Sequence, residues 1–230
     1  MQAYSLVAQT DDYLIINKAP GISVHRDDAD TGLLQQISAD LDCGRLYLVH
    51  RLDKMTSGLL ILACHAEAAS ILSRQFQERR GEKYYISLSD QKTRKKQGLI
   101  RGDMERTHRG SWKLTTGLSN PAVTRFFSCS PVPGLRLFLL RPLTGKTHQL
   151  RVALKSIGAA IVGDRRYHSA TQAVADRGYL HAWGVAFEWQ GERCEYLCDP
   201  DVGELFLQQA VRQQLENWKP PASQAWPASK

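Results

Sequence analysis

Short apolar runs alternate with longer polar segments along this chain, and the length of these runs predicts β-strands. The runs hold four to nine residues and are rich in β-branched and aromatic side chains, as strands are. Predicted strands cover residues 13–16, 46–49, 58–64, 83–89, 122–128, 135–140 and 181–189. The run 58–64 is apolar without interruption, which is typical of a strand that is buried on both faces.

Three segments have the period of an amphipathic helix instead. Within residues 67–80 the apolar positions are Ala68, Ile71, Leu72 and Phe76, and Gly81 is expected as the C-cap residue. Within 147–157 the predicted buried stripe is Leu150, Ala153, Leu154 and Ile157, while His148, Arg151 and Lys155 share the opposite, polar face. A last helix is outlined by Leu207, Ala210, Val211, Leu215 and Trp218.

The order of these elements predicts an α+β fold. Strands outnumber helices and show no regular βαβ alternation, so we expect a mixed, mainly antiparallel sheet flanked by helices. Residues 1–217 are expected to form one domain. The Pro-rich tail, residues 218–230, lacks periodicity and is expected to be loosely held.

Composition favours a soluble cytoplasmic protein. The chain has 230 residues, 43% of them hydrophobic, and its longest purely apolar run covers only residues 59–64. Crossing a bilayer takes about 20 apolar residues, so no membrane contact is expected. The first residues lack the pattern of an export signal. Five scattered cysteines are typical of reduced thiols in the cytoplasm.

Positive charge is concentrated in two stretches of a chain whose net charge is +7. Residues 92–113 hold eight Lys and Arg against two acidic residues, and residues 141–166 hold six against Asp164. Such density attracts polyanions, and two stretches favour a nucleic-acid partner. For the first stretch alone, a solvated loop is the alternative.

The segment HRLDKMTSG, residues 50–58, places one anion among cations where a strand begins. Asp53 lies in a loop between two predicted strands, with Arg51 before it and Lys54 after it. An Asp before Thr-Ser-Gly often only caps its own turn. Loops on a rigid scaffold also carry catalytic groups, and a neighbouring Arg51 would keep the carboxylate ionised and nucleophilic.

Six motifs in order resemble the RluA-type pseudouridine synthases. HRLDKMTSG is similar to the family signature HRLD-x-x-TSG. The others are INKAPGISVH (16–25), QFQERRGEKYY (75–85), PLTGKTHQLRV (142–152), GDRRY (163–167) and LHA (180–182). The resemblance spans about residues 10–185 and implies the pseudouridine synthase catalytic fold. It implies an isomerase that converts a specific uridine in structured RNA to pseudouridine, with rRNA favoured over tRNA.

The resemblance also implies roles for individual residues. Asp53 takes the place of the catalytic aspartate, Tyr85 that of the tyrosine against the target uracil, and Arg151 that of the arginine paired with the carboxylate. Whether the carboxylate attacks C1′ or C6, or removes the 2′ proton, is left open. Together with the basic stretches, the motifs name as RNA-contact candidates His50, Arg51, Lys83, Lys95, Lys96, Arg106, Arg109, Lys146 and His148. Two positions depart from the family pattern, Lys146 for an arginine and Ala153 for a histidine; these leave RNA grip and local packing in question.

Other patterns in the chain predict no second site. HRDDAD (25–30) lacks the glycine and glutamate of a calcium loop, Cys194 and Cys198 lack zinc-ribbon spacing, and Asp164 is expected to be a turn or cap residue. No nucleotide-binding glycine loop is present, so no cofactor or metal is predicted. A monomer is expected. The main alternative is a non-catalytic RNA-binding or RNA-folding factor with the same fold, which would not need the carboxylate; a DNA-binding regulator fits the charge but not the motifs.

Overall fold

A computed structural model of the chain describes residues 2–24, 32–93, 95–168 and 175–228. Its residues form two compact units. The first unit comprises Met1–Glu82 and His181–Asp199, and the second comprises Lys83–Leu180 and Pro200–Lys230. The acidic segment HRDDAD lies outside the described residues. No helix within the described ranges is long and apolar enough to span a membrane.

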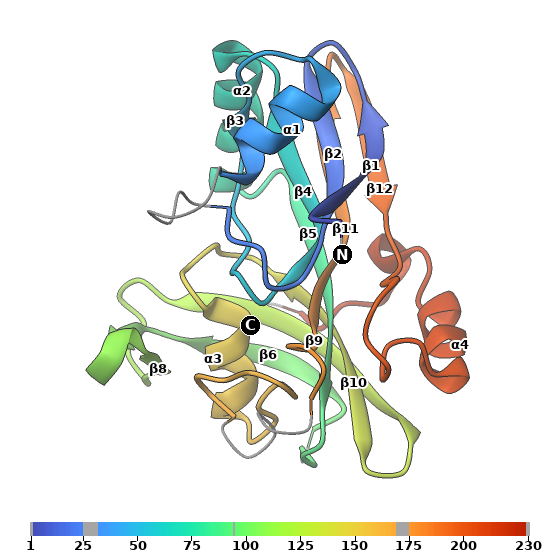
Figure 1. Ribbon diagram of the computed structural model, residues 1–230. Coiled ribbons are helices and arrows are strands. Elements are labelled where there is room, and N and C mark those ends of the chain that lie inside the picture. Colours follow the sequence, from blue (N-terminus) through green and yellow to red (C-terminus); the bar gives the residue numbers. More distant parts are fainter. Residues whose placement is uncertain (1, 25–31, 94, 169–174, 229–230) are drawn as a thin grey trace. The chain divides into compact units, whose positions relative to one another are not determined.

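The first unit is a mixed sheet with two helices. Its elements are β1 (Tyr4–Gln9), β2 (Tyr13–Lys18), α1 (Leu33–Leu41), β3 (Tyr47–Leu48), β4 (Ser57–Ala63), α2 (Ala66–Gln77), β11 (Leu180–Trp189) and β12 (Glu192–Leu197). Strand β2 lies between β1 and β4, with antiparallel pairing on both sides (Figure 1). Strand β11 pairs with β4 in parallel and with β12 in antiparallel. The predicted mixed, mainly antiparallel sheet is confirmed.

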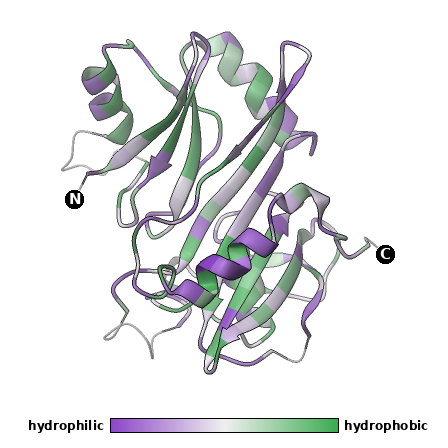
Figure 2. Cartoon of the chain, turned by 90° about the vertical axis from the view of Figure 1, so that its right-hand side faces the viewer, coloured by the Kyte–Doolittle hydropathy of each residue, from purple (hydrophilic) through white to green (hydrophobic). Residues whose placement is uncertain are grey.

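The core of this unit forms where α2 covers one face of the sheet. Alternate residues of β2, β4 and β11 point to the same face because side chains alternate along a strand. This core includes Ile15, Ile61, Phe187 and, from α2, Ala68 and Leu72. All seven residues of β4 are buried, as its unbroken apolar run predicts, so its other face is covered as well. Figure 2 shows the hydrophobic residues following the strands.

The end of α2 differs from the prediction. The helix stops at Gln77, and the left-handed residue after it is Arg79 (φ 62°), not Gly81. A Cβ on Gly81 would stand 2.7 Å from the Phe76 ring, so this glycine allows close packing instead of capping the helix. Ile71, predicted on the buried stripe, is 43% exposed. The buried position is taken by Gln75, whose amide exchanges hydrogen bonds with the backbone of Glu188 on β11.

The second unit combines an antiparallel sheet, a small hairpin and two helices. Its elements are β5 (Glu82–Ser89), β6 (Gln97–Gly102), β7 (Met104–Arg106), η1 (His108–Gly110), β8 (Trp112–Leu114), β9 (Ala122–Val132), β10 (Leu135–Pro142), α3 (Gln149–Ser156), α4 (Gln209–Asn217) and η3 (Pro221–Ser223). The sheet order is β5-β10-β9-β6, and β7 pairs with β8. Helix α3 packs on β8, β9 and β10, and α4 packs on β9. Within the stretch 92–113, residues 97–102, 104–106 and 112–113 are strand, so the stretch is not one continuous loop.

The C-terminal tail is packed rather than loosely held, which corrects the prediction for its described part. Trp218 and Pro221 are buried. The Trp226 ring lies 5.0 Å from that of Phe127 and 5.9 Å from that of Tyr84. Large apolar side chains give the tail a core contact that periodicity cannot reveal, because a single tryptophan has no period. The expectation of one domain over 1–217 stays a prediction.

Candidate active site

Asp53 lies in a tight turn that enters β4 in the first unit. Its carbonyl accepts a hydrogen bond from the Thr56 amide at 2.9 Å, which closes the turn. Leu52 and Thr56 are buried on either side, whereas Arg51 and Lys54 are exposed and Asp53 is half-buried. The chain thus anchors the turn through buried neighbours and leaves the two cations in solvent. This arrangement holds a carboxylate at the surface with little freedom of the backbone.

A buried polar pair holds the end of this turn. The Ser57 Oγ lies 2.7 Å from Nδ1 of His181, and Nε2 of His181 lies 2.8 Å from the carbonyl oxygen of Cys198. Because a carbonyl can only accept, Nε2 carries a proton, and in the neutral ring Nδ1 then accepts from the Ser57 hydroxyl. His181 has no solvent-exposed surface. The TSG and LHA motifs therefore meet in one hydrogen-bonded junction between β4 and β11.

Gly58 of TSG is required by the same junction. Its φ is +104°, and a Cβ there would overlap the Ala182 carbonyl of the neighbouring strand. Only glycine combines this backbone conformation with such a close approach. The parallel pairing of β4 with β11 therefore depends on Ser57 and Gly58 of the motif.

Lys18 is a residue whose part in the site the sequence analysis missed. It is fully buried, and its ammonium donates to the carbonyls of Ala19 at 2.8 Å and Ile22 at 2.9 Å. These bonds shape the turn after β2, whose Gly21 amide donates to the carbonyl of Lys54 at 2.8 Å. Lys18 thus supports the Asp53 turn from behind. The available signal was a lysine at the end of an apolar strand, directly before a Pro-Gly turn.

His50 has a packing role in the structure. Its Nε2 accepts a hydrogen bond from the Ile61 amide at 3.3 Å, and its ring lies 5.6 Å from the Phe76 ring. The imidazole thus links the start of the HRLD segment to the middle of β4. An RNA contact by His50 stays a prediction.

Tyr85 and Lys83 lie on β5 in the second unit. Tyr85 is 7% exposed and pairs with Leu140 of β10. Lys83, two residues earlier, points to the same face of the strand. Burial lowers the pKa of its ammonium to about 8, because a charged amine loses hydration there. The Lys83 Nζ lies 3.9 Å from where a Cβ on Gly145 would stand, which places it beside the TGK turn.

Arg151 is buried on α3, which corrects its predicted place on the polar face opposite the buried stripe. It is 7% exposed, and its Nε and Nη2 each donate to a carboxylate oxygen of Asp164 at 2.7 Å. Asp164 is fully buried and also accepts from the backbone amides of Arg166 at 3.0 Å and Tyr167 at 3.2 Å. The expected turn role of Asp164 is confirmed, and the ion pair with Arg151 adds to it. Polar spacing on a short helix does not distinguish a solvated arginine from one buried with a partner.

The THQ segment before α3 is organised by Gln149. Its side-chain oxygen accepts from the Thr144 hydroxyl at 2.7 Å and from the Lys146 amide at 3.0 Å. The Lys146 ammonium donates to the carbonyl of Asn120. Lys146 therefore ties the TGK turn to the loop before β9, so the lysine in place of the family's arginine has a structural contact. Ala153, the other departure, is buried within α3.

The remaining candidates lie at several places in the second unit. Lys95 and Lys96 are exposed just before β6, and Arg106 is exposed on β7. The side chain of Arg109 lies outside the described part of the chain. His148 precedes α3 with φ 57°, and its Nδ1 lies 3.0 Å from the Tyr167 hydroxyl. Asp53 belongs to the first unit and Tyr85 and Arg151 to the second, so a pair between Asp53 and Arg151 stays a prediction.

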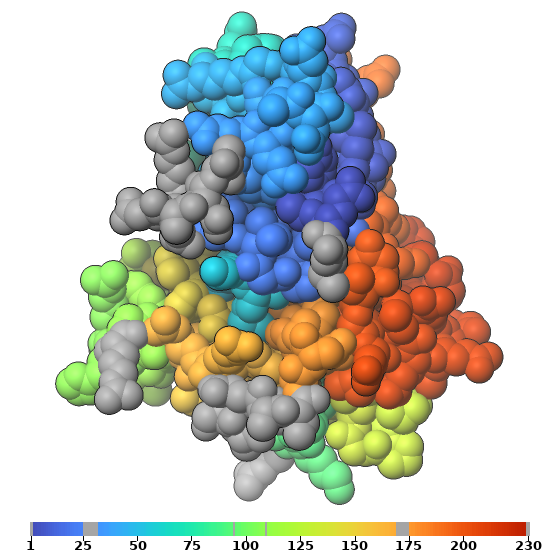
Figure 3. Space-filling view, in the orientation of Figure 1, coloured from blue at the N-terminus to red at the C-terminus, as the bar shows by residue number. Residues whose placement is uncertain are grey.

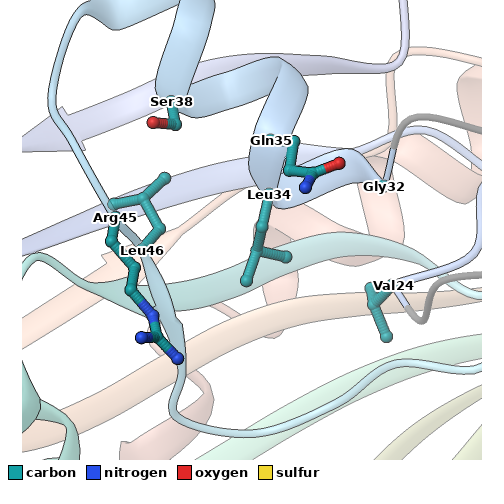
Figure 4. Close-up of a pocket in the computed structure, with 7 residues that line it drawn as sticks. All are labelled: Val24, Gly32, Leu34, Gln35, Ser38, Arg45 and Leu46. Carbon is teal, nitrogen blue, oxygen red and sulfur yellow. The ribbon is translucent and has the colours of Figure 1, made fainter.

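A separate pocket lies in the first unit between α1 and residues 45–46 (Figure 4). Its walls are mainly apolar, with Arg45, Gln35 and Ser38 supplying polar groups at the edge. None of its seven lining residues is a candidate named by the motifs. The five cysteines are free thiols.

Comparison with known proteins supports one family. Residues 12–156 match the model of the family described as RNA pseudouridylate synthase. An uncharacterized RNA pseudouridine synthase of Haemophilus influenzae is 48% identical, and the alignment covers 92% of this chain and 94% of that protein. The ribosomal large subunit pseudouridine synthase C of Vibrio parahaemolyticus is 30% identical over 80% of this chain, which spans only 61% of that relative's length.

Solved structures agree with the sequence relatives. Human RNA pseudouridylate synthase domain containing 1 superposes with a TM-score of 0.74 at 25% identity, covering 99% of this chain and 97% of that one. Human RNA pseudouridylate synthase domain containing 4, at 23% identity and a TM-score of 0.73, has the same fold and covers 90% of this chain and 92% of that one. The chain therefore belongs to the RluA-type RNA pseudouridine synthases, isomerases that act on RNA.

Proposed function

We propose that Asp53 is the catalytic carboxylate of an enzyme that isomerises a specific uridine in structured RNA. The observation that carries this proposal is the Asp53 turn itself. Asp53 is half-buried in a turn whose backbone is fixed by the Thr56–Asp53 and Gly21–Lys54 hydrogen bonds, with the exposed cations Arg51 and Lys54 on either side. Loops held by a rigid scaffold often carry catalytic groups, and exposed cations beside the carboxylate suit an RNA substrate. Asp164 is an example of a structural aspartate in this chain, because it is fully buried and its carboxylate accepts four hydrogen bonds.

The reaction conserves every atom of the nucleotide. The N1–C1′ bond breaks, the uracil turns, a C5–C1′ bond forms, and the proton on C5 moves to N1 through solvent or a protein base. Substrate and product have the same composition, so the bond changes need neither an oxidant nor a reductant. The target nucleotide must leave its stack for the carboxylate to reach it, as in other base-modifying enzymes.

Tyr85 and Arg151 have distinct roles in this proposal. Tyr85, almost fully buried on β5, supplies a flat aromatic face for the uracil and a hydroxyl near C5. Arg151 supplies positive charge for the Asp53 carboxylate. Its side chain is oriented by Asp164, and groups of a functional site need such support from neighbouring residues. Arg51, exposed beside Asp53, contacts the RNA around the target.

Ribosomal RNA is the proposed substrate class. The support is the name of the relative from Vibrio parahaemolyticus, which refers to the large ribosomal subunit. Transfer RNA is the alternative. Mapping pseudouridines in total RNA from a strain that lacks this protein tests the choice. A single missing position in large-subunit rRNA is expected, and a missing position in tRNA would overturn the rRNA assignment.

Release of tritium from RNA labelled at C5 of uridine tests the chemistry directly. Isomerisation replaces the C5–H bond by C5–C1′, so each turnover releases one label to water. The test uses total RNA from the deletion strain. The full chain is expected to release label with wild-type Asp53 and to release none with Asp53→Asn. Binding without release by the wild-type chain would instead support the alternative of an RNA-binding or RNA-folding factor.

A further inference from the structure

The two basic stretches of the sequence meet in the second unit. The β7–β8 hairpin belongs to the first stretch, and α3 with the turn after Asp164 belongs to the second. The Trp112 amide on β8 donates to the Tyr167 hydroxyl at 3.0 Å. A Cβ on Gly110 would stand 3.5 Å from Nη1 of Arg166. In Figure 3 the green hairpin lies beside the yellow and orange residues of α3 and this turn.

Tyr167 is the residue that joins them. Its hydroxyl also lies 3.0 Å from Nδ1 of His148, and its side chain is buried. The guanidinium of Arg151 lies 5.1 Å from the centre of its ring, and the ammonium of Lys155 lies 5.5 Å from it. One side chain thus contacts the hairpin by its hydroxyl and α3 by its ring. The hairpin has only two short strands, and pairs of this size need such an attachment to be stable.

The joined elements carry more cations than anions at their surface. Arg106, Lys113, Lys155 and Arg166 are exposed. Arg106 lies over the Trp112 ring at 5.6 Å, so it reaches the same junction. Among the acidic neighbours, Glu105 pairs with Lys113 at 3.2 Å, Asp103 accepts the amides of Ser119 and Asn120, and Asp164 is buried. The exposed charge of the joined elements is therefore mainly positive.

We infer that the β7–β8 hairpin and the α3–Tyr167 segment form one surface for the RNA backbone outside the target nucleotide. Arg106, Lys155 and Arg166 contact phosphates there, and the Tyr167 hydroxyl holds the hairpin in place. This inference rests on the proposed function, because it takes RNA as the ligand. Phosphate contacts position a nucleic acid without reading its sequence, so this surface adds affinity and orientation.

Two pairs of charge-removing substitutions test the surface. Lys155→Gln with Arg166→Gln removes two cations from it. Lys92→Gln with Arg212→Gln removes two exposed cations elsewhere in the same unit and serves as the matched control. Binding of a short RNA stem-loop is measured against salt concentration. The slope of log affinity against log salt is expected to fall by about 1.4 to 1.8 for the first pair, at about 0.7 to 0.9 per phosphate contact, and clearly less for the control.

Tyr167→Phe tests the attachment of the hairpin. It keeps the ring that faces Arg151 and Lys155 and removes the hydroxyl that accepts from Trp112. We expect weaker stem-loop binding and a lower salt slope, with thermal unfolding measured to show that the chain is folded. Tyr167→Leu removes the ring as well, so it is expected to lower the turnover number in addition, whereas Tyr167→Phe mainly raises KM.

Each outcome has a defined meaning. The inference that this surface binds RNA is overturned if the two pairs of substitutions give equal salt slopes. It is also overturned if the wild-type chain does not bind the stem-loop at low salt. Wild-type affinity in Tyr167→Phe overturns the attachment. If the two pairs differ as expected while wild-type protein releases no tritium from labelled RNA, the surface stands and the proposed function fails. If wild-type protein releases tritium but the two pairs give equal slopes, the proposed function stands and the inferred RNA-binding surface fails.

Discussion

Arg151 and Asp164 form a buried, two-pronged ion pair, with both nitrogen–oxygen distances at 2.7 Å. Asp164 is fully buried and Arg151 nearly so. Removing two charges from water costs free energy, which the pair recovers only through good geometry and further hydrogen bonds. Asp164 has those bonds, from the amides of Arg166 and Tyr167. The pair therefore fixes the direction of the Arg151 side chain, and with it one group of the proposed site.

Asp164→Asn should destabilise the protein by about 3–5 kcal/mol, because it leaves the buried guanidinium of Arg151 without its counter-charge. The carboxamide oxygen of the substituted side chain can still accept the two backbone amides, so the turn itself is retained. Urea unfolding measures the change. Asp90→Asn is the control, since Asp90 is 43% exposed in its 2.7 Å contact with His168, and it should cost less than about 1 kcal/mol. Equal destabilisation in the two variants would contradict the importance of the buried pair.

Asp53→Asn should abolish isomerisation and leave both the fold and the affinity for RNA nearly unchanged. The substitution is almost isosteric, and the turn is closed by the backbone carbonyl of residue 53, which asparagine retains. Tritium release, thermal unfolding and RNA binding measure the three properties. A turnover number within about tenfold of wild type would contradict the catalytic assignment of Asp53. Such a change corresponds to a rise of about 1.4 kcal/mol or less in activation free energy.

Arg151→Lys should be less active than wild type but more active than Arg151→Met. Lysine keeps the charge but cannot reproduce two parallel N–H donors to Asp164. Both variants are expected to lower the turnover number more than they weaken RNA binding, because the proposed role is at the reacting uridine. Steady-state kinetics on labelled RNA separates the two effects. A pure rise in KM would show that Arg151 serves binding instead.

Lys83 should make stability depend on pH above neutrality. Its folded pKa of about 8 lies below its ordinary value of 10.5, so the unfolded chain holds the proton to higher pH. Below about pH 8 the folded state carries the full cost of a buried ammonium, and this cost falls as pH rises towards 10.5. The free energy of unfolding of wild type, relative to Lys83→Met, should therefore increase over that interval. A constant difference between the two proteins would contradict the shift.

Removing Lys95, Lys96, Arg106 and Arg109 together should weaken RNA binding and flatten its dependence on salt. The salt slope should fall by about 0.7 to 0.9 for every phosphate that the variant no longer neutralises. The four substitutions are best divided into two variants, because Lys95 and Lys96 precede β6 while Arg106 follows it. The six residues of β6 span about 16 Å at about 3.3 Å per step. If neither half changes the slope, the stretch 92–113 serves only solubility.

The strands and the site motifs were readable in the sequence because both depend on local order. A continuous apolar run such as 58–64 is buried on both faces wherever it lies, and β4 covers Ser57–Ala63. The motif residues are similarly local, since the turn at Asp53 is closed by Thr56 three positions later. The strands β1 and β12 were missed because most of their residues are exposed. Helix α1 was missed although its signal was present, since Leu33, Ile37 and Leu41 recur at every fourth position.

Pairing between distant residues was decided only by the tertiary structure. The spacing of Arg151 places it on the polar face of its helix. Its burial depends on an ion pair with Asp164, which lies 13 positions later in the chain. Likewise, the two basic stretches are separate in sequence, and the contact of Tyr167 with Trp112 across 55 positions brings them together. The sequence by itself determined which segments bury apolar surface and which motifs place the chain in its family. Which polar groups meet depends on long-range packing, because a hydrogen bond or ion pair requires a partner that no local pattern specifies.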